Sequence, residues 1–170
     1  MTFLTCRPGA AASVALLLSL APTATMAQDV EYFPTPTIGV RSGYAFTQKR
    51  AIVGASSSVP LDARFEIILG GDLIIYGADE RWRIGADVVF RIGQVGEYYA
   101  GAGLAMSDFR READVAGSTE FGYAFVAGYE MGRARNWSLR PFIEPRWTLI
   151  DNRTLFMVGV GINYALEKPF

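Results

Sequence analysis

Hydrophobic and polar residues alternate along most of the chain after residue 36. The clearest segment is 81–93, where alanine and large hydrophobic residues take every even position, and charged residues and glycine take most odd positions. Successive side chains of a strand point to opposite faces of a sheet, so a period of two predicts a β-strand. One face of this strand is apolar, and the other carries charge.

The same alternation recurs in six other segments of the chain. They are 38–46, 64–75, 98–107, 121–131, 139–149 and 156–166. An eighth segment, 50–59, alternates only loosely, with Val53 and Val59 as its best apolar-face positions. Short connections between the segments suit neighbouring antiparallel strands. The pattern therefore predicts an all-β fold, a closed antiparallel up-and-down barrel of about eight strands.

The pair Gly70-Gly71 interrupts one of these segments. A turn at this pair would leave residues 73–76 too short to cross a membrane, since a tilted membrane strand needs about 9 to 11 residues. We therefore predict a β-bulge within one long strand.

Charged residues of the strands all lie on the face opposite the aromatic stripe. They are Arg41, Arg64, Glu66, Asp72, Arg83, Asp87, Arg91, Glu130, Arg140, Glu144 and Arg146, six positive and five negative. An arginine or lysine facing lipid at mid-membrane costs about 2 to 4 kcal/mol, so this exclusion is expected in a bilayer. The nearly balanced charge predicts a salt-bridged network inside the barrel, with glycine and alanine leaving room for arginine–carboxylate pairs. Tyr76, Tyr99, Phe142 and Met157 would share the lumen.

Aromatic residues of the apolar face lie where a membrane-interface belt would place them. Those expected at the lipid interface are Trp82, Phe90, Phe121, Tyr129, Trp147 and Tyr164. Trp and Tyr prefer the headgroup level, and membrane barrels carry aromatic girdles at both rims. The periodicity alone also allows the reverse arrangement, a secreted soluble barrel whose aromatics surround an apolar ligand.

The N-terminus is typical of a secretory signal peptide. Arg7 precedes an apolar run from Ala10 to Ala21, and Thr25-Met26-Ala27 supplies small residues at a cleavage site. The run is well short of the roughly 20 residues of a membrane-spanning helix. We expect a signal peptide at 1–27, Sec-type export, and a barrel domain at 28–170. The single cysteine, Cys6, would be lost with the signal.

Composition argues against several classes of function. The chain has no histidine, so the usual general base near neutral pH is missing. Ser56, Ser57, Ser58 and Ser107 therefore have no obvious activating partner, and a carboxylate dyad of Glu66 with Asp87 would have arginine neighbours that favour a structural role.

We expect no enzyme activity, no cofactor and no metal site, since the acids also lack calcium-loop spacing. A net charge of −1 with scattered arginines gives no reason to expect nucleic-acid binding.

The C-terminus carries a loose assembly motif. Gly161, Tyr164 and Leu166 have the spacing of glycine followed by two hydrophobic residues, and the chain ends in Phe170 on the same parity. Here the sequence resembles outer-membrane β-barrels, whose last strand is read by the barrel-assembly machinery. Residues 167–169 set the motif four residues from the terminus, a departure from that pattern.

In size and strand count, the chain resembles small eight-stranded barrels of the OmpA/OmpX type, a class that includes opacity and porin-like proteins. The resemblance implies termini in the periplasm, residues 108–118 in an external loop, and outer-membrane lipid or lipopolysaccharide as surroundings. It leaves the oligomeric state open. We expect an integral outer-membrane protein of a Gram-negative envelope with a structural role and at most a narrow pore. The alternatives are a small porin-like channel and the soluble apolar-ligand carrier.

Overall fold

The computed structural model describes residues 35–75, 80–93, 95–109, 118–150 and 153–166. These residues form eight strands: β1 (Thr37–Ala45), β2 (Arg50–Pro60), β3 (Phe65–Ile74), β4 (Glu80–Ile92), β5 (Tyr98–Phe109), β6 (Ser118–Glu130), β7 (Leu139–Ile150) and β8 (Arg153–Ala165). Within the described part of the chain, no helix has the length and apolar character needed to cross a membrane.

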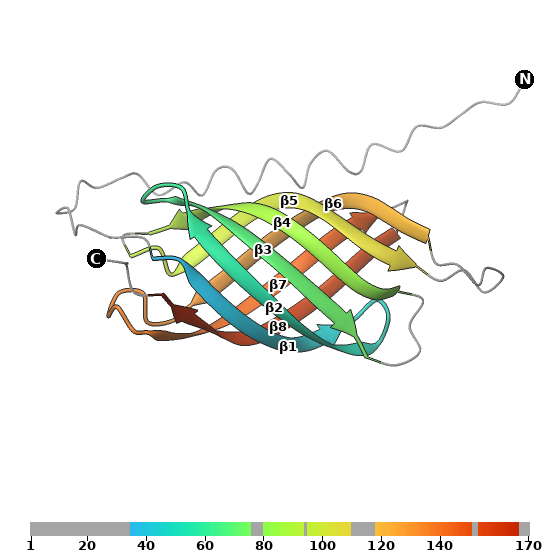
Figure 1. Cartoon of the computed structure of the whole chain (residues 1–170), viewed down its shortest axis with the longest axis horizontal. Coiled ribbons are helices and arrows are strands. Elements are labelled where there is room, and N and C mark those ends of the chain that lie inside the picture. The colour runs from blue at the N-terminus through green and yellow to red at the C-terminus, as the bar shows by residue number, and fades with distance from the viewer. Residues whose placement is uncertain (1–34, 76–79, 94, 110–117, 151–152, 167–170) are drawn as a thin grey trace, which may run out of the picture.

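Each strand pairs antiparallel with the next, and β8 pairs with β1 to close the barrel (Figure 1). This arrangement confirms the predicted all-β, closed up-and-down fold. The loosely alternating segment 50–59 is a full strand, β2, paired along its length with both β1 and β3. The strand count is therefore eight. We call the end where β1 begins and β8 ends the proximal end, and the opposite end the distal end.

The bulge predicted at Gly70-Gly71 is wrong. Gly70 pairs with Ser56 and Gly71 with Ala55, in a register with β2 that continues unbroken through β3. Leu69 and Leu73 are both exposed. They are an even number of residues apart, so a regular strand places both on the outer face without the extra residue of a bulge. Gly71 simply occupies an outward position. A register shift occurs instead between Glu80 and Arg83, where β4 pairs with β5.

The barrel has a charged and tightly filled inner face. Along β7, inward residues are buried and outward residues are exposed, except Pro145, which is half-buried. Small apolar clusters share the interior with the charges. One contains Ala45, Ile52 and Met157 at the distal end, with Ile74 packed against it. Ile74 therefore blurs the alternation of β3 in the sequence because it is an inward residue.

Glycines on the inner face allow the strands and side chains to approach closely. A Cβ added at Gly103 would lie 2.6 Å from the Cα of Asp87 on β4 and would also clash with the Ala86 carbonyl oxygen. Backbone atoms cannot move away as the end of a long side chain can. A Cβ at the outward Gly71 would have only an ordinary contact, 3.6 Å from the Arg83 carbonyl oxygen.

This difference gives a direct test of the packing. Gly103→Ala should lower the free energy of unfolding by about 1 to 3 kcal/mol, the usual effect of overpacking a tight interior. Gly71→Ala should leave it within about 0.5 kcal/mol of the parent protein, as for most surface changes. Urea unfolding in detergent micelles, followed by tryptophan fluorescence, measures both. Equal losses in the two variants would contradict the packing described for β4 and β5.

Candidate functional site: the charged interior and the apolar wall

Ten of the eleven charged residues predicted to face the lumen are buried inside the barrel. They are Arg41, Glu66, Asp72, Arg83, Asp87, Arg91, Glu130, Arg140, Glu144 and Arg146, each at most 5% exposed. They come from five of the eight strands, so the closed sheet brings together charges that are far apart in the sequence.

Arg64 is the exception, and its predicted place in the lumen is wrong. It is exposed in the turn between β2 and β3. The backbone amides of Arg64 and Phe65 donate hydrogen bonds to the Asp62 carboxylate, at 2.6 and 2.7 Å. These bonds lower the pKa of Asp62 below its usual value and fix the turn. Because β3 begins only at Phe65, Arg64 lies outside the strand. The alternation of strand residues therefore does not determine which way its side chain points.

Arg133 is an interior charge that the strand pattern missed. It lies in the turn between β6 and β7, is 3% exposed, and forms ion pairs with Glu66 at 3.3 Å and Glu130 at 3.2 Å. Period-two alternation cannot detect a residue outside a strand; the three-residue spacing from Glu130 was the available signal. With Arg133 in place of Arg64, the fully buried charges of the described interior are still six arginines and five carboxylates.

The central charge cluster consists of Arg41, Asp72, Arg83, Asp87, Glu144 and Arg146. Arg41 binds both oxygens of Asp72, at 2.6 and 2.9 Å, and Arg83 binds the same carboxylate. Arg146 bridges Asp87 at 2.6 Å and Glu144 at 3.0 Å. Three arginines and three acids make this cluster neutral. Its ion pairs cross the lumen and tie together strands that are not neighbours.

The proximal charge cluster consists of Glu66, Arg91, Glu130, Arg133 and Arg140. Arg91 pairs with Glu66 and, at 2.9 Å, with Glu130. Arg140 lies 3.7 Å from Glu130 and donates hydrogen bonds to the Trp137 carbonyl and the Asn136 side chain. Arg133 and Arg140 thus hold the turn between β6 and β7 against the proximal end of the lumen.

Tyr99 connects the two clusters. Its hydroxyl donates to Glu144 at 2.8 Å, and the Arg91 guanidinium lies 4.6 Å from its ring centre. Ile68, Val89 and Val126 pack with it in a buried apolar layer. Two cavities beside the clusters measure about 10 Å³ each, room for about one water molecule. The lumen is therefore filled by side chains at several levels along its axis. Tyr76 lies outside the described residues.

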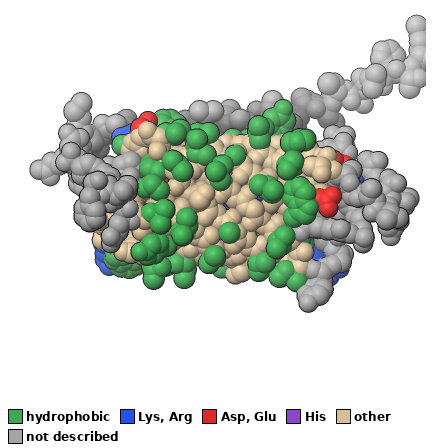
Figure 2. All heavy atoms as spheres, in the orientation of Figure 1, with side chains coloured by type: hydrophobic (Ala, Val, Ile, Leu, Met, Phe, Trp, Pro, Cys, Tyr) green, Lys and Arg blue, Asp and Glu red, His purple; other side chains and the backbone are tan. Residues whose placement is uncertain are grey.

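The six predicted interface aromatics divide equally between the two ends of the barrel. From their strand positions, Trp82, Phe121 and Trp147 lie towards the distal end, and Phe90, Tyr129 and Tyr164 towards the proximal end. Phe121, Trp147, Phe90 and Tyr164 are exposed, and Trp82 and Tyr129 are half-buried. On the face seen in Figure 2, hydrophobic side chains gather towards both ends, with smaller residues and backbone between them.

Further rings complete these two groups. At the distal end, Phe156 stacks with Trp147 at 4.9 Å and with Phe46 at 5.5 Å between ring centres. At the proximal end, Tyr98 lies 4.8 Å from Tyr129. Two aromatic groups separated by aliphatic and small residues form the outer pattern of a membrane barrel.

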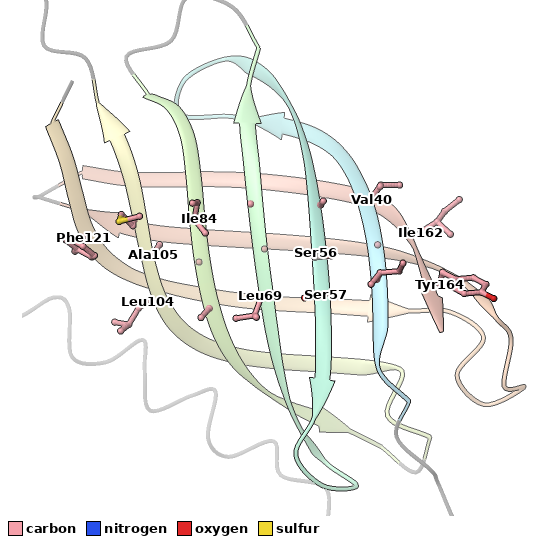
Figure 3. A pocket seen from close by; sticks show the side chains of 18 of the residues that line it. Val40, Ser56, Ser57, Leu69, Ile84, Leu104, Ala105, Phe121, Ile162 and Tyr164 are labelled. Atoms are coloured by element: carbon pink, nitrogen blue, oxygen red, sulfur yellow. The ribbon is translucent and has the colours of Figure 1, made fainter. Parts of the chain in front are cut away.

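The outer wall also contains a shallow apolar depression (Figure 3). Leu69, Ile84 and Leu104, from three consecutive strands, are among its lining residues. Only Ser56, Ser57 and Tyr164 contribute polar side-chain groups to the lining. This apolar concavity thus lies on the outside of the barrel. A soluble carrier would need such a surface inside.

The two carboxylates considered as a catalytic dyad lie in different charge clusters. Glu66 belongs to the proximal cluster and Asp87 to the central cluster, so they form no dyad. Ser58 donates to Glu66 at 2.9 Å and shares a hydrogen bond with Thr37. Within the described ranges, no group of three or more His, Cys, Asp or Glu residues could hold a metal ion.

The C-terminal motif is described in part. Gly161 faces inward, where an added Cβ would lie 2.7 Å from the Phe142 ring. Tyr164 and Leu166 are exposed, at 44% and 37%. Phe170 lies outside the described residues.

The sequence matches no family model and none of the curated proteins compared with it. The fold, in contrast, is similar to that of a β-barrel of known structure. The N-terminal β-barrel domain of Pseudomonas aeruginosa OprF shares 14% identity, with a TM-score of 0.62, over 78% of this chain and 97% of that domain. Ail, the attachment invasion locus protein of Yersinia pestis, shares 14% identity over the same fractions, with a TM-score of 0.48. The chain therefore shares the β-barrel fold of the OprF domain.

The different positions of Arg64 and Arg91 generate a prediction. Arg91→Gln should lower the free energy of unfolding by about 1.5 to 3 kcal/mol, because buried Glu66 and Glu130 each lose a charged hydrogen-bond partner although both keep Arg133. The same change at exposed Arg64 should alter it by less than about 0.5 kcal/mol. Urea titration in detergent micelles checks both variants. A loss at Arg64 as large as at Arg91 would contradict this arrangement of charges.

Proposed function

We propose that the protein is an integral outer-membrane β-barrel of a Gram-negative envelope, with a structural, non-catalytic role and no wide pore. The observation that carries this proposal is the division of side chains: ten predicted lumen charges lie inside, while most of the large aromatic and aliphatic residues of the strands lie outside. In water this arrangement would expose a very large apolar surface. In a bilayer it places hydrocarbon against hydrocarbon and encloses the charges.

The proposal includes a route to the membrane and a set of partners. Residues 1–27 would direct Sec-type export, and the last strand with its Gly161–Leu166 motif would be recognised by the barrel-assembly machinery. The lipids of the outer membrane, including lipopolysaccharide, would surround the wall. The proximal end would face the periplasm, with residues 108–118 on the external side.

A substitution on the outer wall distinguishes lipid from water. Leu104 lies within β5 and is 63% exposed, and Leu61 lies in the turn after β2 and is 59% exposed. In a bilayer, Leu104→Arg should destabilise the barrel by about 2 to 4 kcal/mol, and Leu61→Arg, beyond the strand, by no more than about 1 kcal/mol. Unfolding from phospholipid vesicles measures both. A neutral Leu104→Arg would contradict a lipid-facing wall.

Cell fractionation tests the location itself. We expect the protein in the outer-membrane fraction, migrating on a detergent gel at different positions before and after heating. Recovery of the folded protein in the soluble periplasmic fraction would favour the carrier alternative and refute the proposal.

The filled lumen predicts little conduction. Ion pairs cross the interior in both clusters, and an eight-stranded bore is just wide enough for side chains to fill. In planar bilayers, the purified protein should give no stable, large single-channel steps. Steps of the size produced by wide porins would contradict a structural barrel and support the channel alternative.

A further inference from the structure

The seam between β1 and β8 differs from the other seven strand pairings. Ser42 on β1 pairs with Val160 on β8, 118 positions later, whereas every other pairing joins strands consecutive in sequence. Closing a long loop costs more conformational entropy than closing a hairpin, and distant pairings form slowly. The seam is thus the pairing that gains least from chain connectivity.

One side chain passes across this seam on the inside of the barrel. Arg41, on β1, donates through Nη1 to Glu144 on β7 at 2.8 Å, a contact that reaches over β8. The same guanidinium holds Asp72 on β3 with two hydrogen bonds, at 2.6 and 2.9 Å. Arg41, on β1, therefore links β7, on the far side of β8, to β3, on the far side of β2.

The neighbouring strand leaves space for this link. An added Cβ at Gly159 of β8 would lie 3.6 Å from the Arg41 Cδ and 3.9 Å from the Glu144 carbonyl oxygen. The buried or half-buried inward residues of β8 within the described range carry no charge: Leu155, Met157, Gly159, Gly161, Asn163 and Ala165. An ionic contact from β1 to the far side of the seam must therefore reach β7.

We infer that Arg41 is the closing residue of the barrel, an ionic staple that holds the β1–β8 seam shut from within. The seam is then the place where the barrel opens first when this staple is removed. This role concerns how the barrel closes and stays closed, and it goes beyond the proposed envelope function.

The carboxylates bound by Arg41 have other partners, which makes the test specific. Asp72 keeps Arg83, and Glu144 keeps Arg146 and the Tyr99 hydroxyl when Arg41 is replaced. The loss of Arg41 therefore leaves neither acid without a hydrogen-bonding partner. Arg83 is the matched control, because it also binds Asp72 but reaches Thr148 on β7 without crossing the seam.

The experiment is amide hydrogen exchange of the full chain, with Cys6→Ser, folded in detergent micelles. In Arg41→Gln, exchange in β1 and β8 should be about tenfold faster or more, the scale of a lost charged hydrogen bond, with β4 and β5 much less affected. Arg83→Gln should show no selective increase in β1 and β8. An Arg41→Gln increase spread evenly over all eight strands would overturn the inference.

A covalent link across the seam provides a second measurement. Ser42→Cys with Val160→Cys places two thiols on directly opposed strand positions, where Cα separations suit a disulfide. When oxidised in the Arg41→Gln background, this pair should restore slow exchange in β1 and β8, and reduction should abolish the effect. If Arg41→Gln fails to fold alone, the oxidised pair should recover folding. A folded but unrescued barrel, or no recovery, would refute the staple.

Discussion

Arginine–carboxylate pairing inside the barrel is the interaction on which the rest of this structure depends. Eleven fully buried charges occupy a lumen enclosed by a closed sheet, and each would be costly there without a partner. Pairing across the lumen needs space, which explains why glycine and alanine take so many inward positions. It also joins strands that share no backbone hydrogen bonds. The neutral central cluster and the proximal cluster thus support the sheet from within, and Tyr99 connects them.

The composition of the outer wall follows from the same division. With charge enclosed, the outward positions carry alternating aliphatic, aromatic and small residues, and the large rings gather near the two ends. Such a surface is unfavourable in water and suited to a bilayer bounded by two interfaces. The charged inner face and the apolar outer face therefore depend on each other. Charges can stay paired and enclosed only if the apolar side chains face outward, and an apolar outer face is favourable only against lipid.

The period-two pattern of the sequence was sufficient to predict the fold and most of the interior. It placed ten charges correctly because strand parity determines which face a side chain takes. It failed where parity does not apply. Arg64 has the right parity but precedes β3, and Arg133 enters the lumen from a turn. A bulge is predicted at Gly70-Gly71 because a turn there would leave residues 73–76 too short to cross a membrane, whereas in the structure the register continues. Individual ion-pair partners depend on how the barrel closes, which no single strand encodes.

The most direct test of this account uses the three native tryptophans of the chain. The protein would be reconstituted in vesicles of lipids brominated at different depths of the acyl chain, and its fluorescence quenching measured. If Trp82 and Trp147 lie at a membrane interface, quenching should be substantial and strongest for bromines nearest the headgroups. Fluorescence that is independent of bromination, from a protein that remains folded and dispersed in plain buffer, would show that water bathes the outer wall.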